Sequence, residues 1–66
     1  MSVLKVIELM ASSSEGWEDA TKKGVAKASE TVSNIKSAWL QDQSVTLKDG
    51  KIDEYRVTLK VSFEVK

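Results

Sequence analysis

The clearest pattern in the chain lies in the stretch from Ile52 to Val65, where apolar and polar residues alternate from Glu54 onward. The apolar positions are Tyr55, Val57, Leu59, Val61, Phe63 and Val65. A period of two predicts a β-strand with one apolar face and one polar face. A second strand is predicted from about residue 36 to 47, and Asp49-Gly50 between the two strands is typical of a two-residue type I′ hairpin.

The first half of the chain predicts one strand and one helix. Val3 to Met10 reads VLKVIELM, which indicates a strand that is largely covered on both faces. Apolar residues then follow helical spacing from about Ser14 to Asn34, and the serines before them are candidate N-caps. Within this helix Gly24 is predicted to be a close-packing site, and Trp17 to be an anchor in the core.

These elements predict an α+β domain spanning residues 1–66, with the order β-α-β-β. A three-stranded antiparallel sheet wraps on one helix, which covers its apolar face. A chain of 66 residues has nothing left to cover the second face or the two sheet edges. Since the sequence contains no Cys and no His, neither disulfides nor sites built on these two residue types can staple the fold. Self-association is the remaining way to stabilise so small a domain.

The hairpin register predicts which side chains share a face. If Asp49 and Gly50 form the loop and no bulge intervenes, Leu40 faces Leu59 on the helix side and Trp39 stands on the outer side. The outer facing pairs are Trp39 with Lys60, Gln41 with Thr58, and Gln43 with Arg56.

One residue fits this register badly. Asp42 falls on the apolar side, opposite Val57, and either a bulge or a strand end that projects past the helix would relieve the conflict. The outward Trp39 has three interpretations: a residue of a subunit interface, a stacking platform for a planar ligand, or an ordinary exposed Trp. The first two are the favoured ones. The two are compatible, because a pocket at an interface uses the same side chain for both.

Composition argues against several classes of function: nucleic-acid binding, membrane insertion, catalysis and metal binding. Ten Lys plus Arg balance ten Asp plus Glu, so no basic excess favours nucleic acid. No apolar run approaches the roughly 20 residues of a membrane span, and the start of the chain predicts no signal peptide, which points to the cytoplasm. Without His or Cys, and without a positioned pair of carboxylates, the chain is not expected to be an enzyme. Asp49, Asp53 and Glu54 lack calcium-loop spacing and indicate a solvated turn, so no metal site is predicted.

Several segments together resemble the dodecin family over essentially the whole chain. They are Lys5-Val6-Ile7-Glu8-Leu9, Ser12-Ser13, Gly16-Trp17-Glu18-Asp19-Ala20, Asp49-Gly50-Lys51-Ile52, and the run from Tyr55 to Glu64. The resemblance implies a β-α-β-β subunit, twelve copies of which form a hollow shell. It implies a storage protein that sequesters a flavin (riboflavin, FMN or FAD) between subunits and catalyses no reaction. Some members of the family are described instead as binding calcium or coenzyme A, and a shell with little flavin affinity is the alternative here.

The resemblance also implies where the flavin would lie. The family stacks a Trp of the second strand on the flavin ring, and a Gln of the third strand bonds the polar edge of the ring. In this chain Ser37 takes the usual Trp position, with Trp39 two residues later, and Arg56 takes the usual Gln position. The candidate flavin-binding residues are therefore Trp39, Gln43, Arg56, Ser37 and Gln41.

Overall fold

A computed structural model describes residues 3–65 of the chain. Strand β1 (Val3–Ser13) is followed by helix α1 (Trp17–Thr31), strand β2 (Ile35–Lys48) and strand β3 (Lys51–Val65). The strands form one antiparallel sheet in the order β1-β3-β2, so β3 lies in the centre. The predicted α+β fold and its element order are confirmed. The prediction about a signal peptide concerns Met1 and Ser2, which lie outside the described residues.

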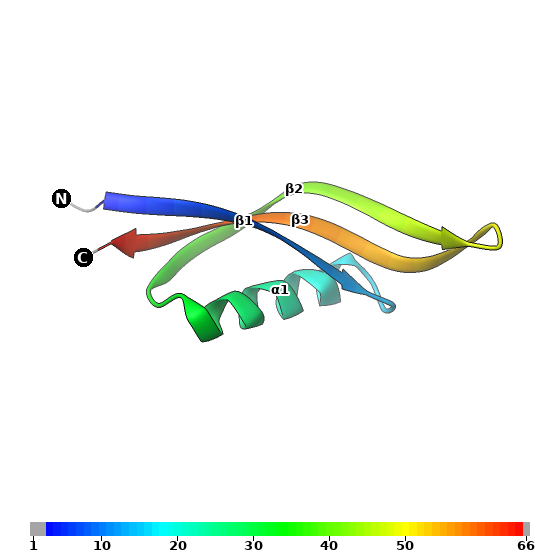
Figure 1. The fold of residues 1–66 in the computed structure, drawn as a ribbon, viewed down its shortest axis with the longest axis horizontal. Coiled ribbons are helices and arrows are strands. Elements are labelled where there is room, and N and C mark those ends of the chain that lie inside the picture. The colour runs from blue at the N-terminus through cyan, green and yellow to red at the C-terminus, as the bar shows by residue number, and fades with distance from the viewer. Residues whose placement is uncertain (1–2, 66) are drawn as a thin grey trace.

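The molecule is elongated, measuring 51 × 19 × 14 Å. Helix α1 lies against one face of the sheet, in the half that also holds the start of β1 and the end of β3 (Figure 1). The tip of the β2–β3 hairpin projects past the helix at the opposite end (Figure 1). One face of the sheet is therefore covered by the helix, and nothing in residues 3–65 forms a layer over the other face.

The hairpin turn follows directly from its Asp-Gly sequence. Asp49 and Gly50 have φ values of 53° and 76°, and Lys48 pairs with Lys51 across the turn. Positive φ at both central residues is the requirement of a type I′ turn, and Asp and Gly adopt it at low cost. The predicted two-residue turn is confirmed.

The core lies where α1 crosses β3. Val57, Leu59 and Val61 of β3 are fully buried, and Ala20 of the helix packs with Val57 and Leu59 in one buried cluster. Gly24 faces the same point: a Cβ added there would lie 2.8 Å from Leu59 Cδ1. The predicted close-packing role of Gly24 is confirmed, since the missing side chain is what lets the helix approach the sheet.

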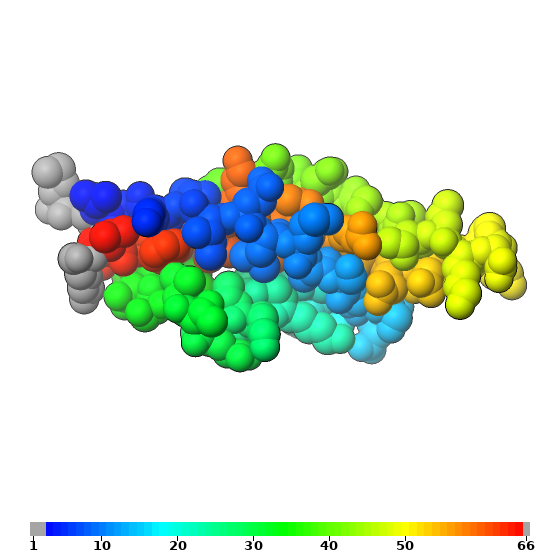
Figure 2. All heavy atoms as spheres, viewed as in Figure 1, coloured from blue at the N-terminus to red at the C-terminus, as the bar shows by residue number. Residues whose placement is uncertain are grey.

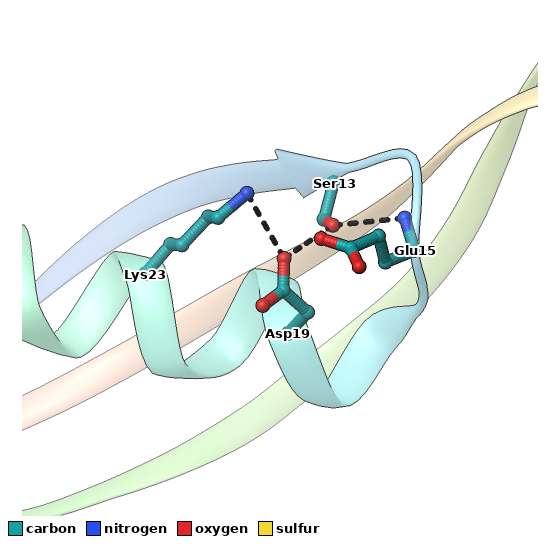
Figure 3. Close-up of polar contacts among 4 residues, drawn as sticks. All are labelled: Ser13, Glu15, Asp19 and Lys23. Carbon is teal, nitrogen blue, oxygen red and sulfur yellow. Dashed lines mark hydrogen bonds and ion pairs between the residues drawn. The ribbon is translucent and has the colours of Figure 1, made fainter.

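The start of the helix differs from the prediction. The N-cap is Gly16, with no side-chain cap, so the prediction of a serine N-cap is wrong. Instead β1 continues to Ser13, whose hydroxyl accepts from the Glu15 N–H at 3.0 Å and donates to Asp19 at 2.5 Å (Figure 3). Lys23 pairs with the same Asp19 carboxylate at 3.0 Å (Figure 3). This network ties the end of β1 to the first two turns of the helix.

Trp17 anchors the helix to the hairpin, but not from within the core. Its indole N–H donates to the Ser44 carbonyl at 2.9 Å, and its ring meets Tyr55 edge-on at 5.1 Å between centroids. The side chain stays 36% exposed. The contact is a clamp at the margin of the sheet, so the prediction of a core position is wrong.

Candidate ligand-binding face of the sheet

The face of the sheet that points away from α1 is called the outer face here. Because Val57, Leu59 and Val61 are buried under the helix, the alternate residues of β3 point outward. Facing residues of neighbouring strands share a side, so the register assigns the members contributed by β1 and β2. The outer face comprises Leu4, Val6, Glu8, Met10 and Ser12 of β1, Ser37, Trp39, Asp42 and Ser44 of β2, and Arg56, Thr58, Lys60, Ser62 and Glu64 of β3.

Trp39 occupies the predicted place on this face. It pairs with Lys60, and Lys60 in turn pairs with Glu8 on the far side, so the three form one row across the sheet. The Trp39 side chain is 44% exposed. An indole in this position offers an open aromatic surface with charged groups beside it.

A β-bulge in β2 changes the neighbours of Trp39. The register shifts between Leu40 and Asp42, so Asp42 pairs with Thr58 on the outer face and Gln41 has no ladder partner. Of the two explanations for the misfit of Asp42, the bulge is confirmed. The predicted pairing of Gln41 with Thr58 is wrong, because the bulge inserts one residue at that point.

A second register shift, between Thr46 and Leu47, leaves Asp53 without a ladder partner and removes Gln43 from the outer face. Gln43 pairs with Val57, on the helix side, and Ser44 takes the position opposite Arg56. The expectation that Gln43 lies beside Trp39 is therefore wrong. Sequence reasoning missed Asp42 as the outer-face neighbour of Trp39, although the poor fit of an acid opposite Val57 was the available signal.

The remaining candidate residues lie at different distances from Trp39. Ser37 is in the preceding outer position of β2, where its hydroxyl lies 2.6 Å from that of Ser62, which is buried. Arg56 is on the outer face, four residues before Lys60 and hence about 13 Å from it along the strand. The structure thus brings Trp39, Ser37 and Asp42 together and places Arg56 farther along the same face.

The bulge also hollows the surface. A shallow, open concavity of about 380 Å³ lies directly after Trp39, at the free edge of β2, and is lined by Leu40, Gln41, Asp42 and Gln43. Asp42 reaches it from the outer face, whereas Leu40 and Gln43 reach it from the helix side. This volume lies within the range of about 300–1,000 Å³ of small-molecule sites, but such sites enclose most of their ligand. One copy of the chain supplies a platform and an open hollow without a lid.

The outer face carries an apolar strip along β1. Leu4, Val6 and Met10 are each more than half exposed and share this face with Trp39. Figure 2 shows β1, in blue, running uncovered along the molecule. Within one chain the prediction of a strand covered on both faces is wrong, because no part of residues 3–65 covers this side of β1.

The electrostatic perturbations lie away from this face. The hydrogen bond from Ser13, together with Lys23, holds the pKa of the Asp19 carboxyl below its usual value of 3.8. The hydrogen bond between Lys23 and the Asp19 carboxylate raises the pKa of Lys23 above its usual 10.5.

Among residues 3–65 no three His, Cys, Asp or Glu side chains cluster to hold a metal ion. In the same residues no helix is long and apolar enough to cross a membrane.

Comparison with known proteins gives one consistent result. The Dodecin family model matches residues 3–66. The calcium dodecin of Mycobacterium tuberculosis is 33% identical over 66 residues, covering 100% of this chain and 93% of that protein.

Solved structures agree with this match. The dodecin from Streptomyces davaonensis superposes with a TM-score of 0.93 at 29% identity, covering 98% of this chain and 96% of that chain. The crystal structure of M. tuberculosis calcium dodecin, described as calcium-chelating with a novel calcium-binding site, has a TM-score of 0.86 at 36% identity. That match covers 98% of this chain and 93% of the other. The chain belongs to the dodecin family.

Proposed function

We propose that this protein is a non-catalytic flavin store, in which copies of the chain form a dodecameric shell and hold riboflavin, FMN or FAD between them. The single observation that carries the proposal is the open indole of Trp39 on the outer face of the sheet. Ser37, Gln41 and Arg56 are its proposed polar neighbours in the site.

The indole suits a planar aromatic ligand. Stacking of two aromatic systems contributes about 0.5–1.5 kcal/mol beyond the burial of their area. Trp39 lies along β2 between the hydroxyl pair of Ser37 and Ser62 on one side and the bulge on the other. A flat ring laid on Trp39 would therefore meet an aromatic surface beneath it and polar groups around it.

The open outer face supports a site between copies. A flat surface cannot enclose most of a ligand, whereas a second copy laid over it can. The strip of Leu4, Val6 and Met10 is apolar surface of the kind that a partner covers, since burying such a side chain contributes about 1.5–3 kcal/mol. The zero net charge of the chain also offers little repulsion between copies.

The basic groups of the outer face suit a phosphorylated flavin. Lys60 lies opposite Trp39, and Arg56 lies farther along β3. Neither side chain forms an ion pair within the described residues. Arg binds phosphate through two parallel hydrogen bonds, so Arg56 is the proposed contact for the phosphate of FMN or FAD.

Calcium is the less supported ligand for one copy of the chain. A calcium site in a protein uses 6–8 oxygen ligands, with carboxylates prominent among them. No cluster of three acidic side chains exists in residues 3–65. The flavin proposal rests on a feature that is present, the exposed Trp39.

The test is a fluorescence titration of riboflavin and FMN with the wild-type protein, Trp39→Ala and Trp17→Phe. Stacking on Trp39 quenches flavin emission, so Trp39→Ala should weaken binding at least about tenfold, the equivalent of 1.4 kcal/mol. Trp17→Phe is the matched control, because Trp17 clamps the helix to β2 and is absent from the outer face. Unchanged flavin emission with wild-type protein at micromolar concentration refutes the proposal.

A purely structural role for Trp39 gives a different result. In that case Trp39→Ala dissociates the assembly, and flavin leaves the melting temperature of the wild-type protein unchanged. A ligand that binds only the folded state must raise that temperature.

A further inference from the structure

The bulge in β2 gives Trp39 a neighbour that the alternation of the sequence does not place there. Lys60 and Thr58 are adjacent outer positions of β3, about 7 Å apart, and they pair with Trp39 and Asp42 respectively. Asp42 is therefore the next outer-face side chain of β2 after Trp39. Without the bulge its carboxylate would point toward the helix.

Most hydrogen-bond acceptor sites of the Asp42 carboxylate are free to bind a ligand. Its Oδ1 accepts from the Gln43 N–H at 3.0 Å, which fixes the side chain against the bulged backbone. An ionised carboxylate has two oxygens and about four acceptor sites, so most of this capacity stays open. Asp42 is exposed and lines the hollow at the bulge, so a ligand can reach it.

The other polar groups near Trp39 suit this role less well: Gln41 offers only a neutral amide oxygen, and Glu8 lies two strands away, beyond Lys60. Lys60 and Arg56 carry donors only, and Gln43 lies on the helix side of the sheet. Ser37 is hydrogen-bonded to Ser62. A ring N–H at the edge of a stacked ligand therefore finds its strongest acceptor in Asp42.

We infer that Asp42 determines ligand specificity in this site by accepting a hydrogen bond from a ring N–H, so that the site selects planar heterocycles with an imide-type donor edge. This inference rests on the proposed function, since it places the ligand on Trp39. It assigns the recognition of the ring edge to a carboxylate of β2. A charge-assisted hydrogen bond of this kind is stronger than a neutral one and discriminates against a ligand that lacks the donor.

The experiment compares riboflavin with its N3-methylated derivative, which keeps the ring system and loses the imide N–H. Both are titrated into wild-type protein, Asp42→Ala, Asp42→Asn and Asp53→Ala. Asp53→Ala removes the same charge near the hairpin turn, away from Trp39, and is the matched control.

Wild-type protein should bind riboflavin about 10- to 100-fold more tightly than the N3-methyl compound. Asp42→Ala should lose that preference and bind riboflavin about as weakly, whereas Asp42→Asn, which keeps a neutral acceptor, should fall between the two. Asp53→Ala should behave as wild type. The comparison of the two ligands on wild-type protein needs no variant, so it holds even if an Asp42 substitution impairs folding.

The failures of the two proposals are distinguishable. If riboflavin binds in a Trp39-dependent way and wild-type protein binds the N3-methyl compound equally well, the role of Asp42 is refuted and the flavin proposal stands. If neither compound binds wild-type protein, both proposals are refuted.

Discussion

Replacing Gly24 with Ala has two opposite effects on stability: it raises helix propensity, and it overpacks the core between the helix and the sheet. In an exposed helix interior Gly→Ala stabilises by about 1 kcal/mol, because Ala has the higher helix propensity. At Gly24 the new methyl would lie 2.8 Å from Leu59 Cδ1 and 3.1 Å from Ala11 Cβ. Leu59 is fully buried, so it cannot swing into solvent, and the Ala11 methyl is fixed to the backbone of β1.

The steric cost of the added methyl group should exceed the gain in helix propensity. Overpacking a closed core costs about 1–3 kcal/mol, from which the gain of about 1 kcal/mol in propensity is subtracted. Gly24→Ala should therefore lower the free energy of unfolding by about 1 kcal/mol, equivalent to a fall of roughly 4–8 °C in melting temperature for a domain of this size. The sign is the informative quantity, because propensity alone predicts an increase.

The assay is urea unfolding followed by circular dichroism, at one fixed protein concentration because self-association stabilises the folded state. Ala26→Gly is the matched control: Ala26 is an exposed residue of the same helix, so its replacement measures propensity without packing. It should lower stability by about 1 kcal/mol. A Gly24→Ala protein that is more stable than wild type would refute the close approach of helix and sheet described here.

Two further substitutions test the contacts at the start of the helix. Trp17→Phe keeps the ring beside Tyr55 but removes the 2.9 Å hydrogen bond to Ser44, so urea unfolding should show a loss of about 0.5–1.5 kcal/mol, and no loss would mean that the bond contributes nothing. For Asp19, the depressed pKa means that its stabilising contribution is present above pH 3.8 and is lost as the pH falls through the folded-state value. Asp19→Asn should therefore lower stability at neutral pH and flatten the acid limb of a stability–pH profile, and an unchanged acid limb would contradict the role of the Ser13 contact.

The sequence specified those elements whose signal was local. Asp49-Gly50 requires a positive-φ turn, and the alternation in β3 is enforced by burial of one face under the helix. The small residue Gly24 marked the close approach of helix to sheet. In each case the residue type leaves few structural alternatives, so the pattern was sufficient.

The course of β2 could not be read in the same way. Residues 41–44 are Gln-Asp-Gln-Ser, so no buried side chain distinguishes one register from another. The bulge at Gln41 carries no glycine signature, and only the misfit of Asp42 indicated it. Counted from the turn, the shift between Thr46 and Leu47 displaced Gln43 by one position, so its predicted place was wrong. The bulge at Gln41 reverses that displacement, which is why Trp39 was placed correctly.

The helix start was mispredicted for a different physical reason. A run of three serines offers several caps, but Ser13 is tied to Asp19 and to the Glu15 N–H, so β1 extends to it and Gly16 takes the N-cap. This choice depends on a side-chain contact six residues apart. Local propensity does not contain that information.

The proposed function requires that copies of this chain assemble and hold a flavin on Trp39 between them. Sedimentation velocity of the protein mixed with FMN, recorded at once in the protein band and in the visible flavin band, tests both parts in one measurement. Flavin absorbance should move with a particle of dodecamer size, and Trp39→Ala should form the same particle without the flavin. A particle the size of one chain, or flavin that stays behind while the assembly sediments, would contradict the proposed function.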